Sequence, residues 1–219
     1  MIPKFTIFGK KKNCMKYLSF HKSFQALPIF SINDVLKAEP DFDRKQLVYW
    51  QKRGYIQKII NRWYNFSEIN LSEEDLYFIA NKIYSPSYIS FESALAHHGL
   101  IPESVYTITS ATTLKTNNFK TYTGEFKYHK LKLNLMFGYN LLSVGNRQVK
   151  IAEPSKALLD YLYINSQINS EEDLEGLRLN REVFKKLIHK KHLNEYLSFY
   201  NTKALNQTVN LLLKIMTHA

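Results

Sequence analysis

Hydrophobic and polar positions divide the first 70 residues into short helices and a hairpin. Apolar residues, Leu18 among them, gather from about 14 to 26 and predict a helix that Pro28 ends. Ser31 is followed three residues later by Asp34, which predicts an N-cap and an approximate capping box for a second short helix. Two helices are therefore expected before the most strongly marked segment, FDRKQLVYWQKRGYI.

That segment carries start and stop signals for a third helix. Asp43 is a good N-cap, Gln46 would complete a capping box, and Phe42 and Leu47 stand at the positions of a hydrophobic staple. Gly54 can supply the left-handed residue that follows many helices. Two β-rich runs in YIQKIINRWYNF then predict a hairpin. Helix, helix, helix, hairpin is the order of a winged helix-turn-helix.

After residue 70 the periodicity changes several times, which predicts an α+β domain. Ser72 with Asp75 begins a helix that we interpret as a connection, and a second helix is expected between an N-cap at Ser90 and a stop at Gly99. From residue 105 to 150 the pattern favours strands, including the run LNLMFGY. Pro154 suits the first turn of the next helix. We expect a winged helix-turn-helix at 1–70 and a mixed α/β domain at 71–219, with a connecting helix at 71–84, a core at 85–165 and a helical tail at 166–219.

Charge changes this picture by suggesting a partner. The 219 residues carry a formal net charge of +11, which favours nucleic acid, an anionic membrane or an acidic protein as partner. Thirteen Lys and Arg against five Asp and Glu precede residue 71, so +8 of the charge lies in the predicted winged helix-turn-helix. The excess is therefore concentrated where a DNA-binding domain is expected.

The third helix separates its apolar and basic positions. At 100° per residue, Leu47 and Trp50 fall on one side and the basic residues spread over the other, as a helix lying in a major groove requires. Phosphate contacts would come from the hairpin and from the N-terminal arm. The predicted DNA-binding residues are Arg44, Lys45, Val48, Tyr49, Lys52 and Arg53 on the helix, Lys58 and Arg62 on the hairpin, and Lys10, Lys11 and Lys12 in the arm.

Two other interpretations stay open. The basic helix could be a solvated face of a domain used for protein contacts. Alternatively, the second domain could bind RNA or another polyanion without promoter specificity, because lysines and aromatic residues alternate along its predicted strands. The residues concerned are Lys115, Lys120, Lys127 and Lys130, with Phe119, Tyr122, Phe126 and Tyr128 as stacking surfaces.

An enzyme is not expected. The adjacent His97 and His98 would point about 100° apart on a helix and could not share one metal ion without distortion. Glu92, Glu153 and Asp160 could form a carboxylate cluster, but carboxylates placed as Glu153 and Asp160 are more often caps or ion-pair partners. No phosphate-binding glycine loop and no Gly-x-Ser-x-Gly elbow occurs in the sequence. We expect no catalysis, no metal and no cofactor.

The sequence also carries hints of its compartment. Cys14 is the one cysteine, which rules out an intramolecular disulfide and fits a reducing compartment. The N-terminal residues do not follow the order of a secretory signal, and no apolar run approaches the length of a membrane helix. We expect a cytoplasmic protein with no membrane partner.

Several segments in order resemble the AbiEi family of antitoxins, from type IV abortive-infection toxin-antitoxin systems. They are YISFESALAHHGLIPESVYTITSATTLKTNNFKTYTGEFKYHKL, FGY and VKIAEPSKALLDYLY, and a looser match covers the winged helix. The family's motif residues correspond here to Ser90, Glu92, Ser93, Ala94, Leu95, Gly99 and Leu100, and to Glu153, Pro154, Lys156, Ala157, Leu158, Leu159 and Asp160, most of which look architectural.

The resemblance implies a transcriptional regulator that represses its own operon in phage defence. It would bind inverted repeats through the N-terminal domain, as a monomer or weak dimer off DNA. The C-terminal domain would neutralise a nucleotidyltransferase-like toxin, AbiEii, by direct contact or by protecting the toxin's target. In one departure, family wings commonly carry a glycine before the tyrosine of the second strand, where this chain has Trp63 before Tyr64.

Overall fold

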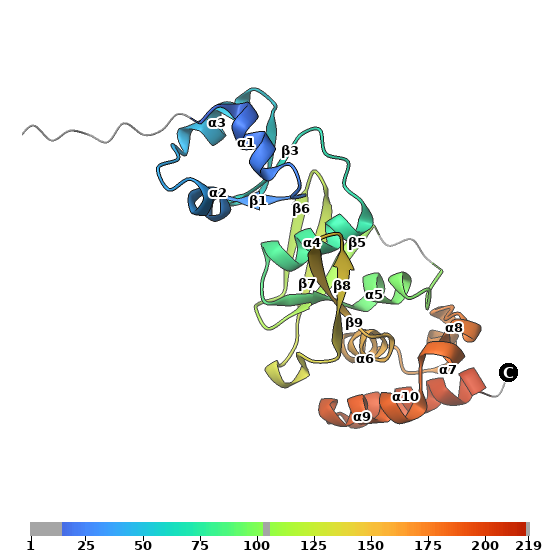
Figure 1. Cartoon of the computed structure of the whole chain (residues 1–219). Coiled ribbons are helices and arrows are strands. Elements are labelled where there is room, and N and C mark those ends of the chain that lie inside the picture. Colours follow the sequence, from blue (N-terminus) through green and yellow to red (C-terminus); the bar gives the residue numbers. More distant parts are fainter. Residues whose placement is uncertain (1–14, 103–105, 218–219) are drawn as a thin grey trace, which may run out of the picture. The chain divides into compact units, whose positions relative to one another are not determined.

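The computed structural model describes residues 15–102 and 106–217, which form a mixed α+β protein (Figure 1). Contacts divide the chain into a first unit, Met1–Asn70, and a second unit, Leu71–Ala219. The first unit contains α1 (Tyr17–Phe24), β1 (Phe30–Ser31), α2 (Ile32–Ala38), α3 (Lys45–Lys52), β2 (Ile56–Ile60) and β3 (Trp63–Phe66).

The second unit begins with a helix and continues through a sheet into a helical end. Its elements are α4 (Glu73–Ile83), β4 (Ser87–Ile89), α5 (Phe91–His97), β5 (Thr107–Thr112), β6 (Asn117–Thr121), β7 (Gly124–Lys130), the 3₁₀ helix η1 (Leu133–Leu135), β8 (Tyr139–Val144), β9 (Arg147–Ala152), α6 (Pro154–Ile164), α7 (Glu171–Gly176), α8 (Arg181–Leu187), α9 (Lys190–Tyr200) and α10 (Lys203–Thr217). No described helix between residues 15 and 217 is both long and apolar enough to cross a bilayer.

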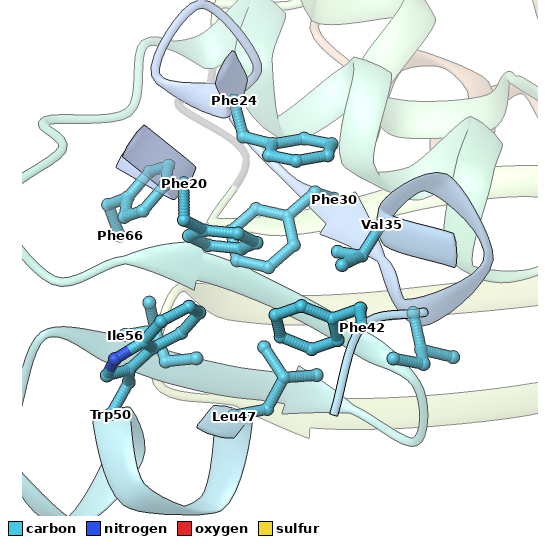
Figure 2. Packing of buried hydrophobic residues seen from close by; sticks show 10 residues of the cluster. Phe20, Phe24, Phe30, Val35, Phe42, Leu47, Trp50, Ile56 and Phe66 are labelled. Carbon is cyan, nitrogen blue, oxygen red and sulfur yellow. The ribbon is translucent and has the colours of Figure 1, made fainter. Parts of the chain in front are cut away.

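An aromatic core holds the first unit together. Phe20 of α1 contacts the rings of Phe30, Phe42, Trp50 and Phe66, with ring centroids 4.5–6.0 Å apart. Figure 2 shows these rings meeting between α1, the sheet and α3. Aromatic pairs add to the free energy of apolar burial, so a short chain obtains a stable core from a few large side chains. Leu18, expected on the apolar side of α1, is instead 73% exposed, because Phe20 and Phe24 fill that side.

The sheet of the first unit has the order β1-β3-β2, in which both pairs of strands are antiparallel. The predicted hairpin forms β2 and β3, whereas β1 was not predicted because it is only two residues long. Directly after β1, the predicted cap of α2 is confirmed: the Ser31 hydroxyl oxygen accepts a hydrogen bond from the Asp34 N–H at 3.1 Å, and the Asp34 carboxylate accepts one from the Ser31 N–H.

The ends of α3 agree with the sequence signals in part. The Asp43 carboxylate accepts a hydrogen bond from the Lys45 N–H at 3.1 Å, which is a capping contact, although the assigned helix starts one residue later than predicted. The predicted Gln46 bond of the capping box is wrong, since that amide lies against the backbone of Met15. At the other end, Gly54 adopts a φ of +73° and closes the helix as predicted.

The described strands of the second unit form a sheet with the order β6-β7-β5-β4-β9-β8. β5 pairs with β7 in parallel and β4 with β9 in parallel, and the other neighbours are antiparallel. Helix α4 lies on one face, where the Tyr128 hydroxyl of β7 donates to the Ala80 carbonyl at 2.7 Å. The helix predicted as a connection at the start of the second domain is therefore also part of the core of the second unit.

The opposite face of this sheet is covered by α5 and α6. Ser93 of α5 is hydrogen-bonded to Thr109 of β5, whose side chain points away from the α4 face. The later helices α7, α8 and α10 pack together beyond α6, in orange and red in Figure 1. The run LNLMFGY, predicted as a strand, forms η1 and only the first residue of β8, so that prediction is wrong.

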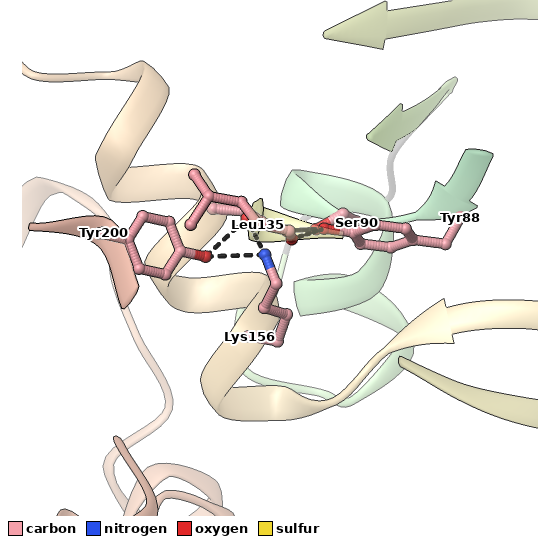
Figure 3. Close-up of polar contacts among 6 residues, drawn as sticks. Tyr88, Ser90, Leu135, Lys156 and Tyr200 are labelled. Carbon is pink, nitrogen blue, oxygen red and sulfur yellow. Dashed lines mark hydrogen bonds and ion pairs between the residues drawn. The ribbon is translucent and has the colours of Figure 1, made fainter. Parts of the chain in front are cut away.

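A buried polar network joins four parts of the second unit (Figure 3). Asp160 of α6 accepts hydrogen bonds from the hydroxyls of Tyr88, Ser90 and Tyr200 at 2.7–2.8 Å and forms an ion pair with Lys156. Both charged side chains are 0% exposed. Burial lowers the pKa of Lys156, and the negative charge of Asp160 opposes that change. Ser90 was predicted to cap α5, but its hydroxyl donates to Asp160 and makes no capping bond.

Gly138 allows Tyr196 and Lys156 to pack closely beside this network. Its φ is +66°, and a Cβ at this position would lie 2.8 Å from a ring carbon of Tyr196 on α9 and 3.2 Å from Cγ of Lys156. Any larger residue would therefore require the Tyr196 ring or the Lys156 side chain to move, and the positive φ adds backbone strain. The glycine of the FGY segment is thus required by packing.

Candidate nucleic-acid interface

Helix α3 presents one buried and one exposed side. Leu47 and Trp50 are each 3% exposed, whereas Val48 and Tyr49 are each 53% exposed. With 100° per residue, the six predicted DNA-binding residues of this helix occupy about half of its circumference. They form two rows at four-residue spacing, which are Arg44, Val48 and Lys52 in one row and Lys45, Tyr49 and Arg53 in the other.

The exposed side of α3 is positive, and its cations have no acidic partner among the residues that the structure describes. Arg44, Lys45 and Lys52 are exposed, and no carboxylate of the described chain lies within ion-pair distance of them. The Arg53 Nε–H donates to the Tyr49 hydroxyl at 3.1 Å, and its guanidinium lies 5.4 Å from that ring. Tyr49 therefore holds one arginine along the helix surface, which reduces the entropy that an anionic ligand would have to remove.

In the first unit, the described contact between a carboxylate and a basic side chain lies away from α3. Glu68, after β3, lies 2.6 Å from Nε2 of His21 on α1. The ring of His21 contacts Phe66 of the aromatic core. This contact anchors the end of the hairpin to α1 and leaves the exposed side of α3 uncompensated.

The hairpin carries the other two described candidates, Lys58 and Arg62, both exposed. Arg62 forms the turn with Asn61 and has a φ of +69°, a left-handed conformation in which glycine is usual. Its carbonyl accepts a hydrogen bond from the Ile32 N–H at 3.0 Å, and Trp63 pairs with Ser31. The turn is therefore fixed to the start of α2 even though it has no glycine.

Sequence reasoning predicted Arg62 as a phosphate contact but missed its backbone conformation. The other predicted candidates, Lys10, Lys11 and Lys12, lie outside the described residues, as do Cys14 and the start of the β region at 105.

The alternative RNA surface on the second sheet is corrected in part. Phe126 and Tyr128 are 0% exposed, because both pack on the face covered by α4, so neither can stack on a base. Phe119 contacts Tyr128 and is half-buried. Lys115, Lys120, Lys127 and Lys130 are exposed as expected, and Tyr122 is 52% exposed.

The residues considered for catalysis are distributed among structural contacts. Glu153 accepts a hydrogen bond from the Tyr196 hydroxyl at 2.8 Å, and Asp160 belongs to the buried network. The Nε2–H of His98 donates to the Ala152 carbonyl at 2.8 Å, while His97 contacts the ring of Tyr77. Within residues 15–102 and 106–217, no three His, Cys, Asp or Glu side chains gather as metal ligands would.

No protein-family model matches the chain, and a comparison with curated proteins finds no match either.

Proposed function

We propose that this protein is a DNA-binding autorepressor and type IV antitoxin. The observation that carries the DNA-binding part is the exposed side of α3, where four cations lie around Val48 and Tyr49 without an acidic partner in the part of the chain that the structure describes. A B-DNA major groove accepts one helix, whose cations contact phosphates while other side chains contact base edges. The apolar side chains available here would suit a thymine methyl group.

The arrangement of the first unit supports a winged helix-turn-helix. A strand between the first two helices, followed by a hairpin after the third, gives the sheet order β1-β3-β2. In such a domain α3 would be the recognition helix and the β2–β3 hairpin the wing. Arg62 would then lie at the tip of the wing, where a cation can reach a phosphate.

The antitoxin part rests on the resemblance to the AbiEi family. Ser90, Lys156 and Asp160, which belong to two separate motifs of that resemblance, lie together in the buried network. This proximity gives a physical reason for the two motifs to occur in one chain, because each supplies partners that the other leaves buried. The second unit would neutralise a nucleotidyltransferase-like toxin, by direct contact or by protection of the toxin's target.

The test of DNA binding compares the protein's own upstream duplex with a scrambled duplex at two salt concentrations. We expect the upstream duplex to be preferred at both. In the variant with Lys45→Ala and Lys52→Ala, affinity should fall for both duplexes, and the slope of log K against log salt should decrease by about 2 if each lysine contacts one phosphate.

A matched control removes the same charge from another surface of the first unit. Lys16 and Lys22 are exposed at the two ends of α1, so the variant with both changed to Ala has the same net charge as the α3 variant. Wild-type binding by the α3 variant, or equal losses in the two variants, would rule out α3 as the recognition helix.

A further inference from the structure

A cleft of about 710 Å³ lies in the second unit between α4 and the β8–β9 hairpin. It opens because β4 pairs with β9 at Ile89 and Ile151 only, while β8 and β9 continue to pair as far as Val144 and Arg147. The hairpin therefore leaves the sheet beside α4. Side chains from both elements line the opening, and the charged ones are Lys82, Arg147 and Lys150.

Two of these three cations have no carboxylate partner among the described residues. Arg147 has a counter-ion, since its guanidinium lies 2.6 Å from the Asp75 carboxylate. Burial alone would raise the pKa of Asp75, but the hydrogen bonds from Arg147 and Ser72 hold that pKa below its usual value. Lys82 and Lys150 have no carboxylate within ion-pair distance among the described residues. Two lysines that line the cleft thus have no described carboxylate partner, although Nζ of Lys150 also lies 5.5 Å from the ring centroid of Tyr139.

Two of the cations lie near the same aromatic ring. Nζ of Lys82 lies 5.2 Å from the ring centroid of Phe78, and Cζ of Arg147 lies 5.3 Å from the same centroid. An anion bound beside this ring would be attracted by the charge of Lys82, which has no carboxylate partner among the described residues.

Asn81 supplies an independent indication of a ligand. Its Oδ1 accepts a hydrogen bond from the Lys150 N–H at 2.7 Å, which fixes the orientation of the amide group. The Nδ2 group at the other end is buried without a hydrogen-bond partner in the described structure, and Asn81 is one of the residues that line the cleft. A buried donor without an acceptor costs about 1–3 kcal/mol, so an acceptor is the group that this position lacks.

We propose that this cleft binds a terminal phosphate group carried by a nucleotide. A phosphate has acceptor oxygens for Asn81 and for the cations, and its charge of about −2 matches the two uncompensated lysines. The volume is in the usual range for small-molecule sites and leaves room for a nucleoside beside Ser143 and Gln148. Either a free nucleotide or the phosphorylated end of an RNA strand has this chemistry. The proposal does not rest on the function proposed for the first unit.

The experiment measures binding to the full-length protein by calorimetry, with ATP, adenosine, inorganic phosphate and a short RNA carrying either a 5′-phosphate or a 5′-hydroxyl. Asn81→Asp keeps the acceptor for the Lys150 N–H but replaces the unpartnered donor with a carboxylate oxygen. Lys82→Gln removes one charge from the cleft. Lys127→Gln removes the same charge from an exposed position on the opposite face of the sheet and is the matched control.

We expect ATP to bind and adenosine not to bind, with about tenfold weaker binding or more after Asn81→Asp and a smaller loss after Lys82→Gln. Binding of ATP alone identifies a free nucleotide as the source, and binding of the 5′-phosphorylated RNA alone identifies a strand end. Failure of both ATP and the 5′-phosphorylated RNA to bind, equal binding of adenosine and ATP, or equal losses in Lys82→Gln and Lys127→Gln would overturn the proposal.

Circular dichroism checks the fold of each variant. All three variants should bind upstream DNA as the wild type does, which separates this test from that of α3.

Discussion

At the scale of single residues, His98 shows how burial decides a role that the sequence left open. It follows α5, and its ring donates to the Ala152 carbonyl at the end of β9. Burial lowers the pKa of His98 below its usual 6.5, although the bond to Ala152 opposes this change. The folded protein therefore favours the neutral ring, which has a single N–H to donate.

This burial predicts an acid sensitivity of the second unit. In the pH range between 6.5 and the lower pKa of the folded state, the unfolded chain binds a proton that the folded chain does not, so the free energy of unfolding should fall as pH falls. His98→Gln keeps a donor for the carbonyl and should flatten this dependence, with a loss of about 1 kcal/mol or less at pH 8. Melting temperatures from pH 8 to pH 5 test it.

Some dependence on pH should remain in that variant, because burial and the charge of Lys127 also lower the pKa of His129. His97→Gln is the control, since the neighbouring ring contacts Tyr77 at the surface of α5. An unchanged slope after His98→Gln, with the fold intact, would show that this ring does not control the acid sensitivity.

At the scale of elements, the β2–β3 hairpin combines a strained residue with a candidate role in binding. Arg62 adopts a φ of +69°, which costs about 1 kcal/mol or more in a residue that has a Cβ. Glycine would relieve that strain, although it would also increase the entropy of the unfolded chain. An arginine at this position, where glycine would be less strained, is consistent with a phosphate contact that a glycine could not make.

We therefore expect Arg62→Gly to keep or raise the stability of the first unit, by up to about 1 kcal/mol, while it weakens binding to the upstream duplex. Arg62→Lys keeps the charge and the strain, so it should retain most of the affinity. Urea denaturation and DNA titration of the three proteins measure both effects. If Arg62→Gly binds as tightly as the wild type, the hairpin tip is not a DNA contact.

The elements that the sequence predicted well are those with strong local signals. The caps of α2 and α4, the glycine after α3 and the proline in the first turn of α6 all depend on neighbouring residues, and all are found in the structure. The elements that were missed depend on distant partners. β1 exists because β3 pairs with it, and η1 replaces a predicted strand near the place where Gly138 admits α9.

The candidate sites follow the same rule. The six residues on α3 were predictable because helical periodicity separates them from Leu47 and Trp50. The network around Asp160 and the cleft beside Asn81 were not, because each combines residues more than sixty positions apart in the chain. Periodicity identifies the exposed side of one element, whereas only the fold identifies which elements meet.

At the scale of the whole molecule, the division into two units predicts a division of labour. The aromatic core of the first unit and the polar network of the second are each built from residues of one unit alone. A fragment from Leu71 onward keeps all the described partners of Asp160 and should therefore fold. We expect it to neutralise the proposed toxin in co-expressing cells as the full chain does, and to lose binding to the upstream duplex. Circular dichroism establishes whether the fragment is folded, and a folded fragment that fails to protect cells would mean that the first unit also takes part in neutralisation.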